Sequence, residues 1–153
     1  MLDAFYSTLP AYGLPALFIL SFLAATIMPV GSEWLLVTLL LRGESFATVV
    51  AVATVGNTLG AWTTYLLGLW GGEVLAGRLL GFDAQKLERA RNMYRRWGAW
   101  SLLLAWLPIV GDPLCLLAGL LRLRTRLFVP LVATGKLGRY LLVGWSTLTL
   151  VTP

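Results

Sequence analysis

Histidine is absent from the chain, cysteine occurs once, at Cys115, and only 12% of the 153 residues are charged. A single cysteine excludes an internal disulfide, and without histidine a mixed cysteine–histidine metal site cannot be assembled. We therefore expect neither a metal nor an organic cofactor, and we interpret Cys115 as a packing residue. Soluble proteins carry about 25% charged residues, so the shortage of charge indicates a chain that lies mostly in lipid.

The uncharged stretches are long. Residues 4–32 and 45–72 contain no charged side chain, and residues 97–121 contain only Asp112, whereas about 20 apolar residues suffice to cross a bilayer. The N-terminus lacks Lys and Arg and its apolar run exceeds the core of a secretory signal, so we expect it to be retained. The sequence predicts one all-α integral membrane domain over residues 1–153.

Four apolar segments cover about residues 12–41, 45–72, 97–121 and 127–151, and the first and third are interrupted by residues that break helices. The break residues are Pro29, Gly31, Pro108, Gly111 and Pro113. Only eight residues follow each break before the segment ends, which is about 12 Å of helix and less than half of a bilayer. We predict that these two segments are re-entrant hairpins.

The two halves of the chain share a spacing. Three pairs of residues lie 79 positions apart: Pro29 with Pro108, Glu33 with Asp112, and Gly56 with Gly135. We predict an internal repeat, with one copy over about residues 12–72 and the other over about 97–151, each a re-entrant hairpin followed by a transmembrane helix. Chance similarity between apolar segments is the alternative.

Lysine and arginine set the orientation of membrane proteins, and they occur 12 times against seven acidic residues, for a net charge of +5. If the hairpins turn back, Arg42 alone lies on one face and nine cations lie on the other. If all four segments cross, the basic residues are divided nearly evenly between the two faces of the membrane. We therefore predict an inverted repeat, a cytoplasmic middle segment and both termini outside, with lipid headgroups rather than nucleic acid as the anionic partner.

Residues 82–97, between the repeats, have the pattern of an amphipathic helix. Leu87, Ala90, Tyr94 and Trp97 share one face, and basic residues cover the rest. We expect this helix to lie at the membrane interface and bind anionic lipid. A solvated linker is the alternative.

Four charged residues fall at membrane depth: Glu33, Asp112, Lys136 and Arg139. Each costs about 2.5–3.5 kcal/mol at the centre of a membrane helix. We interpret them as a polar cavity in which Lys136, Arg139 and Tyr140 bind a phosphate while Glu33 and Asp112 couple transport to protons. Two structural ion bridges between hairpins and helices are the alternative.

Glycines recur along the second segment, mostly at a spacing of four, at Gly56, Gly60, Gly68 and Gly72. Such small-residue ribbons allow another helix to approach closely. An internal hairpin and a second copy of the chain, in a homo-oligomer, are both open as the partner.

Several motifs resemble those of one family. They are Pro29-Val-Gly-Ser-Glu33; Gly56-Asn-Thr-Leu-Gly60 with Tyr65 and Gly68; Trp106-Leu-Pro-Ile-Val-Gly-Asp112; and Gly135-Lys136 with Arg139-Tyr140. Together they resemble the DedA family, the bacterial members of the VTT or SNARE-associated superfamily, and most closely its small YqaA-type branch. The chain lacks the flanking helices of longer relatives, and Leu69 stands where larger members have arginine.

The resemblance implies facing re-entrant hairpins, placement in the bacterial inner membrane and lipid translocation. Undecaprenyl phosphate recycling that depends on the proton motive force is proposed for larger relatives. By motif, Glu33 and Asp112 would be the hairpin acids, and Arg139 the helix arginine with Lys136 beside it. We predict a transporter or flippase for a lipid phosphate (polyprenyl phosphate or phospholipid) rather than an enzyme. The alternatives are a scaffold with structural ion pairs and, least favoured, an intramembrane hydrolase using both acids.

Overall fold

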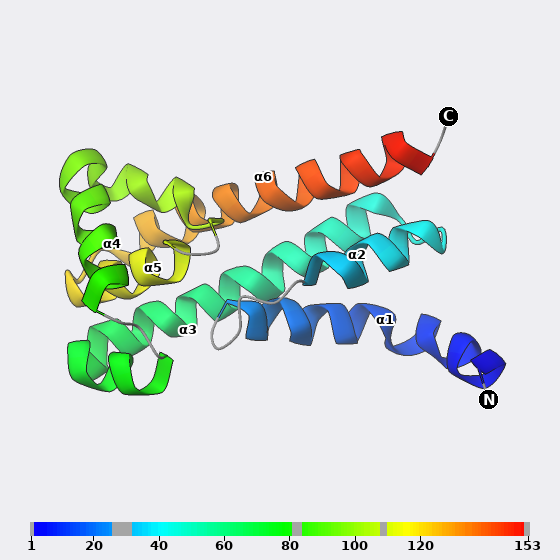
Figure 1. The fold of residues 1–153 in the computed structure, drawn as a ribbon, viewed down its shortest axis with the longest axis horizontal. Helices are drawn as coiled ribbons and strands as arrows, with labels where there is room; N and C mark the ends of the chain where they lie inside the picture. Colours follow the sequence, from blue (N-terminus) through cyan, green and yellow to red (C-terminus); the bar gives the residue numbers. More distant parts are fainter. Residues whose placement is uncertain (1, 26–31, 81–83, 108–109, 152–153) are drawn as a thin grey trace.

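A computed structural model describes residues 2–25, 32–80, 84–107 and 110–151, and Figure 1 shows the chain as helices joined by short turns. The elements are α1 (Leu2–Ala24), α2 (Ser32–Leu41), α3 (Phe46–Leu80), α4 (Ala84–Trp97), the 3-10 helix η1 (Gly98–Leu104), α5 (Gly111–Leu120) and α6 (Thr125–Val151). No strand occurs within the described ranges. The prediction of an all-helical chain is confirmed.

Some boundaries differ from those predicted. The helix α1 begins ten residues before the predicted apolar segment, and α3 continues eight residues beyond Gly72. The helix α5 begins at Gly111, so Gly111 and Pro113 lie in its first turn rather than in a break. Proline fits there because its missing N–H has no partner in the first turn of a helix. The other predicted break residues, at positions 29, 31 and 108, lie outside the described residues.

Two helices are long and apolar enough to cross a membrane. The qualifying stretches are Phe46–Gly71 of α3 and Thr125–Leu150 of α6, each of 26 residues. At about 1.5 Å per residue each extends about 39 Å, which exceeds the hydrocarbon thickness of about 30 Å. The two helices contact each other, and α3 also packs against α1 and α5, so α3 forms the centre of the bundle.

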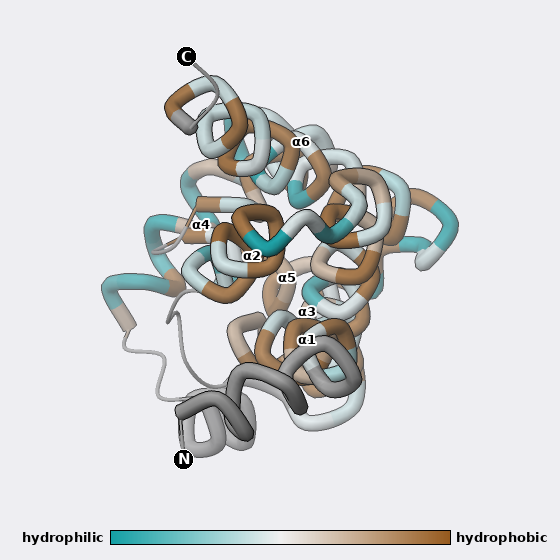
Figure 2. The backbone as a smooth tube through the Cα atoms, turned by 90° about the vertical axis from the view of Figure 1, so that its right-hand side faces the viewer, coloured by the Kyte–Doolittle hydropathy of each residue, from teal (hydrophilic) through white to brown (hydrophobic). Residues whose placement is uncertain are grey.

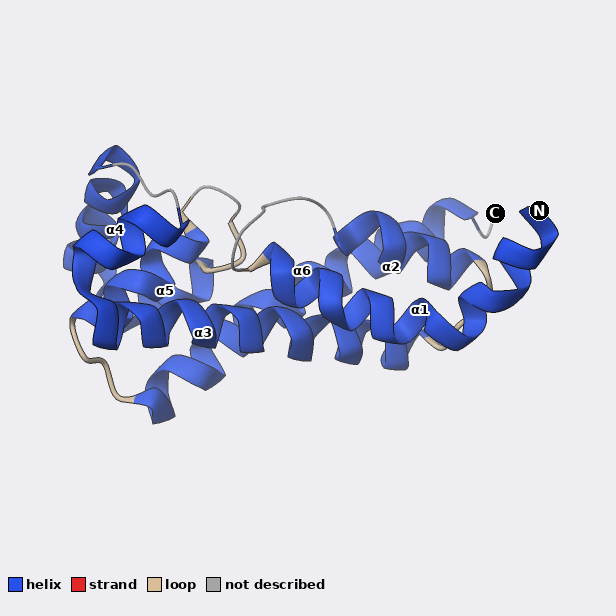
Figure 3. Cartoon of the chain, turned by 90° about the horizontal axis from the view of Figure 1, so that it is seen from below, coloured by secondary structure: helices blue, strands red, loops and turns tan. Residues whose placement is uncertain are grey.

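The shorter helices approach the centre of the molecule from opposite ends. The helix α1 runs inward and α2 returns beside it, whereas η1 runs inward from the other end and α5 returns (Figure 1). Seen from below, α4 and α5 gather at one end, and α2 lies at the other end with the outer ends of α1 and α6 (Figure 3). The 26-residue stretches of α3 and α6 connect the two ends.

The same turn closes α2 and α5. The backbone N–H groups of two successive residues donate to the last turn of the helix, in the pattern of a Schellman motif. These bonds join Gly43 to Leu40, Glu44 to Leu39, Arg122 to Gly119 and Leu123 to Ala118, at 2.9–3.1 Å. The turn residues have positive φ angles, +88° at position 43 and 52° at position 122. These positions are 79 apart, the spacing of the markers in the sequence.

Glycines bring the backbones of neighbouring helices together. A Cβ added at Gly56 or Gly60 would lie 2.6 or 2.3 Å from a carbonyl oxygen of α1. A Cβ at Gly68 would lie 2.3 Å from Leu116 O of α5, and one at Gly119 would lie 2.0 Å from Tyr65 O of α3. At these positions the close partner is another helix of the same chain. Gly72 is not among the residues whose packing the structure describes.

The buried apolar residues form two clusters with polar residues between them. One cluster includes Phe128 and Tyr65, whose ring centroids are 4.5 Å apart, and it joins α3, α4, η1, α5 and α6. The other cluster includes Leu36 and Tyr140 and joins α1, α2, α3 and α6. On α3 and α6, the residues between the clusters include Asn57 and Lys136. The polar site therefore lies near mid-length of the two 26-residue stretches that are long enough to cross a membrane.

The predicted amphipathic helix is α4, which Figure 2 shows as strongly hydrophilic beside the bundle helices. Its Ala90 is fully buried and Tyr94 packs against the apolar cluster formed with α5 and η1, whereas Trp97 is 57% exposed. Much of the apolar face is thus covered by the protein itself rather than left free for lipid. Arg89, Arg95 and Arg96 of α4 are exposed, and α4 lies at the end of the bundle opposite the two termini (Figure 1).

Candidate functional site: a charged network at mid-length of the bundle

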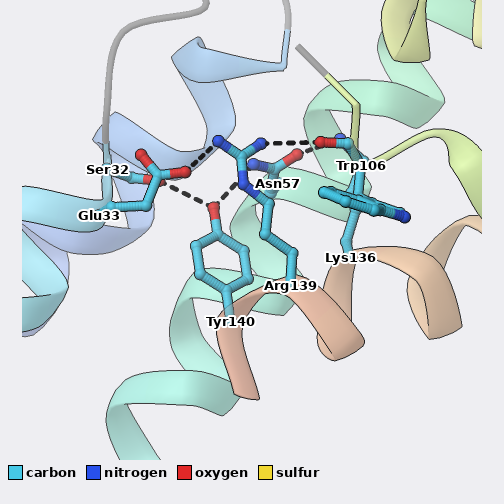
Figure 4. A network of polar contacts seen from close by, with 7 residues as sticks. All are labelled: Ser32, Glu33, Asn57, Trp106, Lys136, Arg139 and Tyr140. Atoms are coloured by element: carbon cyan, nitrogen blue, oxygen red, sulfur yellow. Dashed lines mark hydrogen bonds and ion pairs between the residues drawn. The ribbon is translucent and has the colours of Figure 1, made fainter. Parts of the chain in front are cut away.

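An ion pair joins α2 to α6 near the centre of the molecule (Figure 4). Glu33 lies in the first turn of α2 and accepts from the guanidinium of Arg139, on α6. The first turn of a helix favours an acid because the unpaired N–H groups there carry partial positive charge. The other terminal nitrogen of Arg139 donates to the carbonyl oxygen of Trp106 at 3.1 Å. One arginine therefore connects α2 with the turn between η1 and α5.

A second, more deeply buried chain of hydrogen bonds runs beside the ion pair. Lys136, only 4% exposed, donates to the side-chain oxygen of Asn57 on α3. The amide nitrogen of Asn57 donates to the hydroxyl of Tyr140 at 2.7 Å, and that hydroxyl bonds to the hydroxyl of Ser32 at 2.8 Å. Buried polar groups are costly unless they are hydrogen-bonded. This chain of bonds therefore stabilises the arrangement of α2, α3 and α6.

A cavity of about 20 Å³ lies between these elements, with Glu33, Asp112, Lys136 and Arg139 all in its lining. This volume suffices for about one water molecule. Asp112, in the first turn of α5, forms no ion pair with any described residue, although it lies within electrostatic range of Lys136 and Arg139. The two halves of the chain thus contribute one acid each to a cavity with two acids and two bases.

The arrangement suits anion exchange at Arg139. A guanidinium binds carboxylates and phosphates through the same planar set of N–H donors, so a phosphate would compete directly with Glu33. The side chains of Arg139 and Glu33 are 26% and 24% exposed, whereas Lys136 is 4% exposed. The ion pair is therefore the accessible part of the site, and Lys136 contributes positive charge from behind it.

The structure brings four of the predicted site residues into one cavity lining and places the fifth, Tyr140, fully buried behind it. Three contributors were missed from the sequence: Asn57, Ser32 and the carbonyl of Trp106. Asn57 carried a usable signal, because it is an amide within an uncharged run and lies 79 residues before Lys136. The roles of these residues in binding or proton coupling stay predictions.

Comparison with known proteins now identifies the family. The family model for the VTT domain matches residues 28–146. The chain belongs to the VTT-domain family. It is 40% identical over 142 residues to the inner membrane protein YqaA of Escherichia coli K12, covering 90% of this chain and 92% of that protein. The resemblance to the DedA family and its YqaA-type branch is confirmed, and the chain is a membrane protein of this type.

Proteins of other organisms are also similar to the chain. The chain is 39% identical over 134 residues to an uncharacterized protein of Haemophilus influenzae, covering 81% of this chain and 80% of that protein. It is 27% identical over 109 residues to an uncharacterized protein of Methanocaldococcus jannaschii, covering 71% and 67%. No solved structure matches the chain significantly.

Proposed function

We propose that the chain is an inner-membrane transporter that moves a lipid phosphate, such as a polyprenyl phosphate or a phospholipid, between leaflets. The observation that carries this proposal is the cavity at mid-length of two helices long enough to span a membrane, lined by acids and bases from both halves of the chain. Charged residues at membrane depth are costly and mark substrate or ion pathways in membrane proteins. Under this proposal, the charged residues remain at membrane depth because transport requires them.

The proposed topology makes α1 with α2, and η1 with α5, two re-entrant hairpins that enter from opposite faces. The matching turns at Gly43 and Arg122, 79 residues apart, support an inverted repeat. The position of α4 at the end of the bundle away from both termini supports a cytoplasmic middle segment and outside termini, because cytoplasmic loops carry an excess of Lys and Arg. Described residues on both sides of each hairpin tip, among them Glu33 and Asp112, then line the charged cavity.

Cysteine labelling tests this topology. Ser45 and Gln85 are exposed at opposite ends of the bundle, and Cys115 is fully buried. Single Ser45→Cys and Gln85→Cys variants in a Cys115→Ser background should react with a membrane-impermeant maleimide from opposite sides of the membrane. Reaction of both cysteines from the same side contradicts the hairpin topology.

In the proposed mechanism a phosphate displaces Glu33 from Arg139 while Lys136 adds positive charge. Protonation of Glu33 weakens its hold on Arg139 and so favours the phosphate, and Asp112 offers a second acid across the cavity. Because the cavity has room for about one water molecule, the hairpins must separate before a phosphate can enter. Proton uptake and hairpin opening are therefore coupled.

Reconstitution into liposomes tests transport directly. The wild type should move labelled polyprenyl phosphate or phospholipid between leaflets faster than empty liposomes do. Arg139→Ala should lower the rate about tenfold or more, since hydrogen bonds to charged groups contribute about 1.5–3 kcal/mol. Arg126→Ala, which removes an exposed charge from the first turn of the same helix, is the matched control and should not change it. A rate equal to empty liposomes, unchanged by Arg139→Ala, refutes the proposal.

Anionic lipid is the proposed partner of α4, whose Arg89 and Arg95 are exposed. Each such cation near an anionic surface contributes about 1 kcal/mol, so each replacement by Gln should weaken binding of acidic lipid about fivefold. The control Glu88→Gln, on the same helix, should not weaken binding. Retention of acidic lipid that is unaffected by both arginine replacements contradicts this assignment.

A membrane scaffold is the second candidate, and the hydrogen bonds among α2, α3 and α6 favour it. Under this function the Glu33–Arg139 pair and the bond from Arg139 to Trp106 O only hold the helices together. Glu33→Gln and Arg139→Gln should then both lower the melting temperature, Arg139→Gln more because it also removes the bond to Trp106 O, and both should leave every cellular phenotype of the wild type intact. Loss of a cellular phenotype at an unchanged melting temperature excludes the scaffold.

A further inference from the structure

An apolar groove lies between α2 and α6, on the side of the charged site that faces the termini. Its volume is about 510 Å³, within the range of about 300–1,000 Å³ typical of ligand sites. Its lining includes Val37, Leu41, Leu142, Val143, Thr147 and Leu150. Leu142, Leu41 and Leu150 are more than half exposed, so they form an open rim.

The two hydroxyl side chains in the groove are hydrogen-bonded within their own helix. Ser146 donates to the carbonyl oxygen of Leu142, and Thr147 donates to that of Val143, both at 2.8 Å. Both hydroxyls are therefore satisfied within α6, and the groove offers carbon atoms to an occupant. Such a surface suits a hydrocarbon chain, because a polar ligand would lose its hydrogen bonds to water without replacement.

The groove is a direct continuation of the ion pair. On α6, Val143 follows Arg139 by four residues and Leu150 follows it by eleven, while on α2 Val37 follows Glu33 by four. Residues at these spacings share one helix face. Eleven residues of helix extend about 16 Å, about half of the hydrocarbon thickness. The interface between α2 and α6 therefore carries charged residues at the centre of the membrane. Its apolar part, the groove, extends from there across one leaflet.

We propose that this α2–α6 groove holds the hydrocarbon chain of the lipid whose phosphate reaches Arg139. The inference rests on the proposed function and adds the position of the chain. The positive, partly exposed guanidinium at the head of the groove complements a phosphate, and the apolar remainder complements its chain. The bound lipid lies with its phosphate at the membrane centre and its chain directed toward the end of the bundle that carries the termini.

Blocking the groove tests the proposal by transport. Ser146→Trp places an indole in the groove without touching the ion pair, and Leu141→Trp, on a neighbouring exposed position outside the groove, is the matched control. Ser146→Trp should lower transport of a long-chain polyprenyl phosphate about tenfold, because one misplaced methylene in an apolar site already changes selectivity by about 10–200-fold. It should leave transport of a two-isoprene phosphate unchanged, and the control should change neither.

Photocrosslinking tests the same proposal without relying on transport. A polyprenyl phosphate with a photoreactive group about 16 Å from the phosphate should label residues near Leu150, and a group beside the phosphate should label residues near Arg139. Ser146→Trp should abolish only the distal labelling. Labelling spread evenly over the apolar surface, as by ordinary boundary lipid, overturns the proposal.

The outcomes separate this proposal from the proposed function. If Ser146→Trp leaves long-chain transport unchanged while Arg139→Ala abolishes it, the groove assignment is wrong and the transport function stands. If the wild type transports nothing, the function is wrong and the labelling pattern still decides the occupant of the groove. If Ser146→Cys forms dimers with a short bismaleimide in membranes, a second copy of the chain covers the groove and the proposal is overturned.

Discussion

A methyl group added at Gly119 should force α3 and α5 apart. The added Cβ would lie 2.0 Å from Tyr65 O and 2.9 Å from Leu69 N, and ordinary contact begins at 3.4 Å. Both neighbours are backbone atoms, so no change of side-chain rotamer relieves the clash, and the helices must separate by about 1.4 Å at this point. Overpacking of this kind costs about 1–3 kcal/mol.

The control for this substitution is Gly138→Ala on α6, because nothing lies within 4 Å of a Cβ added there. Both replacements gain the same helical preference of alanine over glycine, about 0.5–1 kcal/mol, so the difference between them isolates the packing cost. At about 2–4 °C per kcal/mol for a chain of this size, Gly119→Ala should melt about 2–12 °C below Gly138→Ala.

The assay is thermal unfolding of both variants and the wild type in one detergent, followed by loss of the monodisperse peak in size-exclusion chromatography. Gly119→Ala should also melt below the wild type when the packing cost exceeds the helical gain. Equal melting temperatures for Gly119→Ala and Gly138→Ala would refute the reasoning, since the close approach of α3 and α5 at Gly119 would then not be a constraint on either helix.

Three further substitutions test the site and the turns. Tyr140→Phe leaves the buried side chains of Ser32 and Asn57 without one hydrogen-bond partner each and should cost about 1–3 kcal/mol in the same thermal assay. Tyr65→Phe removes a single bond to a backbone carbonyl and should cost only about 0.5–1.5 kcal/mol. Gly43→Ala should lower stability by about 1–2 kcal/mol because of its positive φ, and Arg122→Gly, at the matching turn, should raise it by up to about 1 kcal/mol. Lys136→Met leaves the buried side-chain oxygen of Asn57 without its donor. It should cost about 1–3 kcal/mol in the same thermal assay while lowering liposome transport, and a variant that melts above the wild type contradicts this account.

The helices and the charged residues of the site could be predicted from the sequence. Long uncharged runs and isolated charged residues are both strong signals in a chain with so few polar residues. An uncharged run of more than 20 residues has few structural alternatives. A charged residue at membrane depth must find a partner, which is why ion bridges between hairpins and helices could be named as an alternative before the Glu33–Arg139 pair was seen. The sequence also predicted the end of α2 at Leu41.

Other features depend on which surfaces meet, and composition does not determine that. The apolar face of α4 has the pattern of a lipid-binding surface, yet Ala90 and Tyr94 contact the bundle. Gly119 has no distinguishing sequence context, although its contact with Tyr65 O is the closest of the glycine contacts. Asn57 stands out in the sequence as an amide within an uncharged run, but its partner Lys136 is known only from the structure. Each of these outcomes is set by tertiary packing rather than by local pattern.

The contact between Asn57 and Lys136 joins two positions that are 79 residues apart, the spacing of the predicted repeat. Two positions that a rotation exchanges, and that also touch each other, lie on the axis of that rotation. In an assembly of two identical half-length chains, such positions would carry the same residue, so lysine would face lysine or asparagine would face asparagine. Two halves of different sequence, by contrast, can place an amide opposite an ammonium group there. Under the predicted repeat, fusion of the halves in one chain thus permits an unequal centre, in which one half contributes the charge and the other the group that solvates it.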